Sequence, residues 1–417
     1  MNRERHSDVL ILGGGVIGLA TALRLLREGR SVRLLEQQRV GSGSSHGNCG
    51  TITPSHLPLN TPGTISKALR WLLTPDAPLR VKPRVDAALL AWLLRFAALC
   101  NARDLRRITA AKIPLLQTSR ELLEQLIRDE RLDCEFEAGG TMYVWREPAA
   151  FDAAQAEYRL LEEVGIAVER FDGDEARRRE PALNADIVGG HFHPGDARLR
   201  PDRYVAELAR KVNEAGGELC EHCSVEGFRV EAGHIVAVAT THGEYSGDEI
   251  VLALGAWSPI LGRALNLQLP IQPGKGYSIT YSQPPAAPRI PLVLKERSVC
   301  VTRWDSGYRL GSTMEFAGYD RSLNRRRLDA LKRGAAEYLR EPYGAQLEEE
   351  WYGWRPMTRD ELPIIGRAPG YDNLTLATGH GMLGVSLSAV TAQLVADMLA
   401  GRTPLLDAAP FAPSRFH

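Results

Sequence analysis

The stretch Asp8-Val-Leu-Ile-Leu-Gly13-Gly14-Gly15-Val-Ile-Gly18-Leu-Ala20 decides the fold of the N-terminal region. A short apolar run of strand type breaks into glycines and continues as an apolar helical pattern. In the spacing Gly13-x-Gly15-x-x-Gly18, the first glycine permits a tight turn and the second lets backbone N–H groups approach a pyrophosphate. The third allows the helix to pack closely on the strand. We therefore predict a strand, a turn and a helix whose N-terminus binds a dinucleotide.

The residues after this turn support the prediction. The helical pattern stops at Gly29, and a second strand over 31–36 ends in Glu36, eighteen residues after Gly18. A carboxylate there can accept hydrogen bonds from a ribose 2′-hydroxyl. The following loop, Gly41–Gly50, is small and polar, and we expect it to make a second cofactor contact. The alternative is a glycine-rich turn that binds no nucleotide.

Composition limits the classes of function. The 417 residues include 51 Lys and Arg against 51 Asp and Glu, so no overall charge favours nucleic acid. The polar start and short apolar runs predict neither a signal peptide nor a transmembrane helix. Six cysteines without a framework spacing indicate reduced thiols in a cytoplasmic protein. Cys220-Glu-His-Cys223 lacks both a second ligand pair and a following helix, so we expect no metal site and no redox motif there.

One segment, residues 67–107, differs from the rest in charge. It carries nine Lys and Arg against three Asp and Glu, and includes apolar helical stretches over 67–73 and 86–96. A basic segment with interleaved Trp and Leu could lie on an anionic membrane, which would place the protein peripherally on the inner membrane. The alternative is two ordinary helices with basic outer faces.

Further elements follow from periodicity. We predict helices over 104–131 (interrupted at Pro114), 149–165, 202–216, 324–339 and 385–400, and strands over 140–145, 224–230, 234–240, 248–254, 273–280, 298–303 and 308–312. The predicted class is α/β, with a Rossmann-like nucleotide-binding domain and an α+β substrate domain built on an antiparallel sheet. The first domain is expected to comprise residues 1–60, 185–265 and 350–417, and the second 61–184 and 266–349.

The C-terminal region favours FAD over a nicotinamide cofactor. A nicotinamide dehydrogenase would leave the second strand–turn–helix, at Gly379–Gly384, and the buried strand ending at Gly255 without a role. FAD is longer and needs protein at both ends. The N-terminal turn can hold the ADP half, and a helix N-terminus after Gly384 can stabilise the reduced isoalloxazine ring.

Several segments together resemble a known family. Besides the N-terminal turn they are 251–258 (VLALGAWS), 273–278 (PGKGYS), 353–358 (GWRPMT) and 377–384 (ATGHGMLG). In this order, over nearly the whole chain, they resemble the FAD-dependent D-amino-acid oxidase superfamily, most closely its bacterial D-amino-acid dehydrogenases. The stretch Gly47–His56 also resembles the subset that oxidises D-hydroxyproline.

The resemblance implies non-covalent FAD below a sheet-based substrate domain. It also implies oxidation of an amino acid to an imino acid, with the α-hydrogen transferred as hydride to flavin N5. The residues expected at the cofactor are Gly13, Gly15, Val16, Ile17, Gly18, Glu36, Gln37, Ser44, Ser45, Asn48, Cys49, Gly50, Val225, Gly255, Trp257, Gly379, His380, Gly381, Met382, Leu383 and Gly384.

The resemblance further implies a substrate anchor. In related glycine and sarcosine-type oxidases the arginine of Gly-x-Arg-Pro binds the substrate carboxylate, and it corresponds to Arg355; a planar guanidinium suits this task. A structural ion pair is the alternative. Some relatives have a second arginine where this chain has Met382, so Tyr277 is a candidate second anchor, unless its hydroxyl bonds backbone. His56, His380 and Lys275 are further candidates for lining the site.

The leading hypothesis is a D-amino-acid dehydrogenase that prefers D-proline or cis-4-hydroxy-D-proline and passes electrons to a membrane quinone or an electron-transfer chain. Hydride transfer from a neutral amine needs no strong base, so no catalytic triad is predicted. One alternative is a glycine/sarcosine-type oxidase that reduces O₂. Another is a flavin-binding subunit without turnover.

Overall fold

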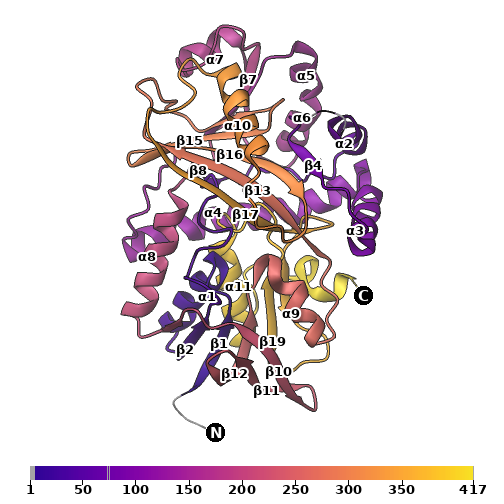
Figure 1. Cartoon of the computed structure of the whole chain (residues 1–417), viewed down its shortest axis with the longest axis vertical. Coiled ribbons are helices and arrows are strands. Elements are labelled where there is room, and N and C mark those ends of the chain that lie inside the picture. The colour runs from indigo at the N-terminus through magenta and orange to yellow at the C-terminus, as the bar shows by residue number, and fades with distance from the viewer. Residues whose placement is uncertain (1–4, 73, 75, 417) are drawn as a thin grey trace.

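The computed structural model describes residues 5–72, 74 and 76–416. Two large sheets lie one above the other along the longest axis of the molecule (Figure 1). The helices are α1 (Val16–Arg27), α2 (Thr64–Leu72), α3 (Ala87–Ala98), α4 (Ala102–Glu130), α5 (Pro148–Ala153), α6 (Gln155–Glu163), α7 (Gly173–Arg179), α8 (Pro201–Glu214), α9 (Ser258–Ala264), α10 (Arg325–Tyr338) and α11 (Ser388–Leu399). Short 3₁₀ turns cover Gly255–Trp257, Ala409–Phe411 and Pro413–Phe416.

The strands of the lower, eight-stranded sheet are β1 (His6–Leu12), β2 (Val32–Leu35), β9 (Glu218–Cys220), β10 (Val225–Glu231), β11 (His234–Thr240), β12 (Gly243–Leu252), β18 (Ile364–Arg367) and β19 (Leu374–Thr378). Its centre is parallel: β9, β2, β1, β12 and β19 lie in this order, and β1 pairs with both β2 and β12. Helices α1, α8, α4 and α11 supply residues to the core on one face, and β10, β11 and the end of α9 cover the other. This is the predicted Rossmann-like domain, and because both faces are covered the second half of β1, Val9–Leu12, is apolar without alternation.

The glycine turn has the predicted geometry. Gly13 has φ +110°, and a Cβ on it would lie 2.5 Å from the Ala253 carbonyl oxygen at the end of β12. A Cβ on Gly18 would lie 2.0 Å from the Gly13 carbonyl oxygen. Both contacts are far too short for any side chain, so glycine is required for α1 to begin this close to β1.

The upper, nine-stranded sheet consists of β4 (Leu79–Val81), β5 (Thr141–Trp145), β6 (Glu169–Asp172), β7 (Gly189–His193), β13 (Ile271–Tyr281), β14 (Leu292–Leu294), β15 (Val299–Trp304), β16 (Gly307–Phe316) and β17 (Leu347–Thr358). Its order is β17-β13-β16-β15-β14-β5-β7-β6, with β4 pairing β16. A small ribbon joins β3 (Thr51–Ile52) to β8 (Ala197–Arg198). Helix α10 packs on the outer face of this nine-stranded sheet. The opposite face of the sheet, here called the cavity face, is directed toward the nucleotide-binding domain.

The structure corrects several predicted boundaries. The break at Pro114 is absent, since α4 continues from Ala102 to Glu130. A proline there removes one helical hydrogen bond, but its neighbours Ile113, Leu115 and Leu116 are buried in the core, and this packing offsets the loss. The predicted helix over 149–165 is the pair α5 and α6. Of the predicted helix 67–73, Leu73 lies outside the described residues.

The division between the domains also differs from the prediction. Strands β7 and β17 belong to the nine-stranded sheet, although residues 185–265 and 350–417 were expected in the nucleotide-binding domain. Helix α4 was expected in the substrate domain but packs on α11. Apolar patterns show that an element is buried but not which of two cores it joins, and this explains the errors. No helix within the described ranges is long and apolar enough to cross a bilayer.

Candidate active site

A cavity of about 1630 Å³ lies between the two sheets. Its lower end is formed by the glycine turn, the loop after β2 and the turn before α11. Its roof is the cavity face of the nine-stranded sheet, from β17 across to β7. The cavity therefore spans the boundary between the two domains, where ligand sites are common.

At the nucleotide end, Glu36 lies against the glycine turn. Its Oε2 accepts from the Gly14 N–H at 2.8 Å, and its Oε1 accepts from the Gln38 N–H at 2.9 Å. Burial raises the pKa of Glu36, and the backbone hydrogen bonds oppose that rise. Ser45 ties the next loop to the turn, since its Oγ accepts from the Val16 N–H at 2.9 Å. The carboxylate and the hydroxyl thus border the place that a dinucleotide would take.

Most residues predicted at the cofactor line this one cavity: Gly13, Gly15, Val16, Ile17, Glu36, Gln37, Ser44, Ser45, Asn48, Cys49, Gly50, Val225, Gly255, Trp257, His380, Gly381, Met382, Leu383 and Gly384. Two do not. Gly18 packs on Gly13, and a Cβ on Gly379 would lie 2.7 Å from Thr358, so both glycines allow close packing. The N-terminal and C-terminal glycine turns lie next to each other here, because a Cβ on Gly384 would lie 3.9 Å from the Val16 side chain. The cavity thus has one glycine turn at Gly13–Gly18 and another at Gly381–Gly384, and this arrangement fits the two halves of FAD.

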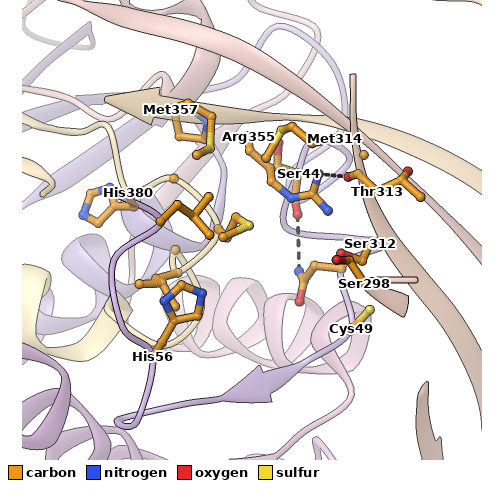
Figure 2. Close-up of a pocket in the computed structure, with 18 of the residues that line it drawn as sticks. Ser44, Cys49, His56, Ser298, Ser312, Thr313, Met314, Arg355, Met357 and His380 are labelled. Atoms are coloured by element: carbon orange, nitrogen blue, oxygen red, sulfur yellow. Dashed lines mark hydrogen bonds between the residues drawn. The ribbon is translucent and has the colours of Figure 1, made fainter. Parts of the chain in front are cut away.

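At the substrate end, Arg355 extends from β17 into the cavity. Its Nη1 donates to the Thr313 carbonyl oxygen at 2.8 Å (Figure 2). A Cβ on Gly276 would lie 2.1 Å from the same nitrogen, so glycine leaves room for the guanidinium. Burial lowers the pKa of Arg355, but a guanidinium remains charged at neutral pH. Arg355 forms no ion pair with any residue that the structure describes, which argues against a purely structural role.

The carbonyl that receives Arg355 is held by an irregular stretch of β16. Ser312 has φ 111° and Thr313 has φ 59°, at the register shift between β13 and β16. Each such conformation costs roughly 1–3 kcal/mol in a non-glycine residue, and strain of this kind is concentrated at functional sites. The strain turns the Thr313 carbonyl toward the guanidinium.

Two predicted site residues face the opposite side of the roof. Tyr277 packs in the core shared with α10, and its hydroxyl donates to Glu315 Oε2 at 2.5 Å. Lys275 donates from Nζ to the carbonyl oxygens of Asp320 and Ser322. Because side chains alternate along a strand, Gly276 faces the cavity instead; Tyr277 also borders the cavity, but its hydroxyl points away from it to Glu315. Tyr277 as a carboxylate anchor and Lys275 as a lining residue are therefore wrong.

The two histidines lie in the cavity in neutral form. Burial lowers the pKa of His56 to about 4 and that of His380 to about 3. His56 Nδ1 is 3.4 Å from the Lys112 ammonium, which can only donate, so the ring hydrogen is on Nε2. His380 Nε2 is 2.9 Å from Thr391 Oγ1. Neither histidine supplies a charged acid at neutral pH.

Several residues of the cavity were not predicted. Ser298, just before β15, and Ser312, on β16, lie side by side below Arg355 and Thr313 in Figure 2, with Cys49 next to them. Farther along the roof come Cys300, Lys295, Tyr143, Trp145, His191 and His193. Strand alternation places each of them on the cavity face, but the sequence does not say which strands are neighbours.

Comparison with known proteins agrees with this site. The family model described as FAD dependent oxidoreductase matches residues 8–398. The D-amino acid dehydrogenase of Xanthobacter autotrophicus is 34% identical over 418 residues, covering 98% of this chain and 99% of that protein. That of Granulibacter bethesdensis is 33% identical over 416 residues, covering 98% and 99%.

Among solved structures, a glycine oxidase from Geobacillus kaustophilus superposes with a TM-score of 0.77, at 24% identity and 99% coverage of both chains. An L-proline dehydrogenase from P. horikoshii gives 0.74, at 18% identity, covering 99% of this chain and 98% of that chain. At these identities the structures establish the fold. The chain belongs to the family of FAD-dependent oxidoreductases, and FAD is its cofactor.

Proposed function

We propose that this enzyme is a dehydrogenase that oxidises D-amino acids at the α-carbon, with a small cyclic substrate such as D-proline or cis-4-hydroxy-D-proline preferred. The observation that carries the proposal is Arg355, a partly buried cation that faces the FAD cavity without a carboxylate partner among the described residues. The related D-amino acid dehydrogenases, similar over nearly their whole length, support the same substrate class.

Arg355 would hold the substrate carboxylate. One of its N–H groups is bound by Thr313, and the remaining donors can form paired, charge-assisted hydrogen bonds to a carboxylate. This would hold the α-carbon of the substrate in one position in the cavity. Bound FAD would supply the hydride acceptor for the α-hydrogen, at its N5 atom. His56 and His380 are neutral, so the site suits an amine that arrives uncharged and needs no strong base.

The wall opposite Arg355 suits a hydroxylated ring. Ser298 and Ser312 present two hydroxyls toward the cavity, below Arg355 and Thr313 in the view of Figure 2. A substrate held by its carboxylate would direct a ring hydroxyl toward these donors and acceptors. This supports cis-4-hydroxy-D-proline within the proposed class.

The far part of the cavity supports a quinone as electron acceptor. His193 on β7 lies three strands from Cys300 on β15, about 14 Å at the usual strand spacing, which exceeds the reach of a small amino acid bound to Arg355. In the described part of the chain, His191 Nε2 and His193 Nδ1 are buried without hydrogen-bond partners. Burial lowers their pKa values to about 4 and about 3, so both rings are neutral.

The charges in this far part nearly cancel. Lys295 pairs with Glu157 at 3.1 Å and lies over the rings of Tyr143 and Trp145. Neutral donors between aromatic walls suit a planar ring with carbonyl oxygens better than an anion, which supports the quinone proposal.

The segment beside this part of the cavity supports contact with a membrane. Helix α2 lines the cavity, yet Leu69 is 60% exposed, and on α3 Leu90 and Leu94 are 59% and 63% exposed. Basic residues Lys67 and Arg70 lie on the same helix as Leu69. Exposed leucines among basic residues are typical of peripheral binding to anionic lipid. Vesicle flotation tests this, and Leu69→Ser with Leu94→Ser should abolish co-flotation with anionic vesicles.

The function is tested by mixing the holoenzyme anaerobically with a panel of D- and L-amino acids. D-forms, and the cyclic ones most strongly, should bleach the flavin. Bleaching by L-forms alone would overturn the proposal, and a flavin that no amino acid reduces would indicate a non-catalytic subunit. Peroxide yield compared with quinone reduction then separates an O₂-using oxidase from a dehydrogenase.

A further inference from the structure

Two cysteines from distant parts of the chain meet in the cavity beside Arg355. Cys49 belongs to the loop that follows β2, and Cys300 lies on β15. Both line the cavity, and both are free thiols. Cys223 also borders the cavity, but at its nucleotide end, where the Cys223 N–H donates to the Glu36 carbonyl oxygen.

The strand register places the two sulfur atoms together. Gly311 on β16 is the direct cross-strand partner of Cys300 on β15. A Cβ on Gly311 would lie 2.5 Å from Cys49 Sγ, so the Cys49 thiol occupies the space that a side chain at 311 would fill. Directly opposed residues in an antiparallel pair have Cα atoms about 4.5–5.5 Å apart, which brings Cys49 Sγ next to the Cys300 side chain. Each thiol also acts directly on the pKa of the other.

The surroundings make the two thiols unequal. The contact with Cys300 and the charges of Arg309 and Arg355 lower the pKa of Cys49. The same contact, together with burial, raises the pKa of Cys300. Cys49 is thus the better nucleophile, and Cys300 keeps a proton beside it. A reactive thiol next to a resolving thiol is the arrangement found in redox-sensitive proteins.

We propose that Cys49 and Cys300 form an oxidative modification site, at which a hydroperoxide closes the pair into a disulfide and blocks the substrate cavity. Cys49 Sγ attacks one peroxide oxygen, the O–O bond breaks, and one water leaves when the peroxide is H₂O₂. Cys300 Sγ then attacks the sulfenic sulfur of Cys49, the S–O bond breaks, and a second water leaves. One peroxide takes two electrons from two thiols, and the thiol hydrogens leave in the two waters.

The disulfide would act at the point where the two domains meet. It ties the loop 41–50, which borders the FAD cradle, to the roof of the cavity beside Arg355. It also removes the ionisable thiols of Cys49 and Cys300, whose thiolate forms would interact with the charge of Arg355. A substrate carboxylate would then meet a cross-link that narrows its path to the guanidinium.

The test treats the FAD-loaded, full-length protein with H₂O₂, alkylates the remaining thiols, and maps the peptides by mass spectrometry. We expect the peptides of Cys49 and Cys300 to be linked, with the loss of two hydrogens. Cys300→Ala should give a sulfenic acid at Cys49 that dimedone captures, and no disulfide. Cys100→Ala and Cys220→Ser are matched controls and should still form the link.

A second readout follows flavin reduction by the best D-amino acid. Peroxide should abolish most of it in the native protein, dithiothreitol should restore it, and Cys300→Ala should resist the loss. Alkylation of both thiols after peroxide, a link confined to Cys220 and Cys223, or a link that leaves flavin reduction unchanged would each overturn the proposal. The peptide map does not depend on the proposed substrate class, so failure of that class is recognised separately when untreated enzyme is reduced by no D-amino acid.

Discussion

Replacing Arg355 by Met removes the guanidinium while keeping an unbranched side chain in the cavity. A bound carboxylate would lose two charge-assisted hydrogen bonds of about 1.5–3 kcal/mol each. The total, about 3–6 kcal/mol, corresponds to a fall in kcat/KM of roughly 10²–10⁴. Arg355→Lys keeps the charge but not the paired hydrogen-bond geometry, so its kcat/KM should lie between those of the native enzyme and Arg355→Met.

Anaerobic stopped-flow reduction of the flavin at increasing concentrations of D-proline measures this effect. FAD content, read from the visible absorbance, should stay unchanged because Arg355 lies on β17, away from the glycine turn. Arg359→Met is the matched control: Arg359 lies over the Phe416 ring at 4.9 Å and does not line the cavity. A fall smaller than roughly tenfold for Arg355→Met would refute the assigned role.

Three further predictions concern FAD binding and stability. Gly18→Val should yield protein without FAD, because α1 must move away from the turn, whereas Gly195→Ala, which meets nothing within 4 Å, should retain it; absorbance at the flavin band decides. Lys112→Met should lower Tm strongly, since a buried Glu361 without its partner at 3.0 Å costs about 3–5 kcal/mol, and adding Glu361→Gln should recover most of it. Four histidines are neutral in the folded protein, whereas in the unfolded chain they take up protons below about pH 6.5. The free energy of unfolding should therefore fall as the pH drops toward 4, by on the order of 1 kcal/mol per pH unit for each histidine. The Tm of the holoenzyme at pH 7 and pH 5 measures this, and a Tm that is higher at pH 5 would contradict it. Asp196 partly opposes that trend. Burial raises its pKa to about 7, so the folded protein keeps a proton on this carboxyl that the unfolded chain has lost, and the stability gained from this group decreases as the pH rises. These histidines are His56, His191, His193 and His380.

Local rules were sufficient for the nucleotide end of the site. The glycine spacing, the apolar half of β1 and the acid at Glu36 each depend on neighbours within one strand–turn–helix–strand unit, and the structure brings all of them to the same turn. The C-terminal turn at Gly381–Gly384 could be found for the same reason. Its position beside Val16 depends on the fold as a whole.

The substrate end was harder because a strand has two faces. In β13 the polar Lys275 and Tyr277 suggest chemistry, but both side chains bond groups outside the cavity. Gly276 lies against Arg355 because the guanidinium needs the space. The strained pair Ser312 and Thr313 could not be predicted, because nothing in their residue types favours positive φ.

The alternation of the chain between its two sheets has a consequence for synthesis on the ribosome. Strand β1 is among the first segments made, but its sheet includes β19, and α1 packs against α11. At about 5–20 residues per second, roughly 20–70 s pass between the emergence of β1 and that of β19. During this interval the nascent chain carries apolar surface whose partners have not yet been translated. Its yield in a cell should therefore depend on holding chaperones more than that of a protein whose domains are consecutive in sequence.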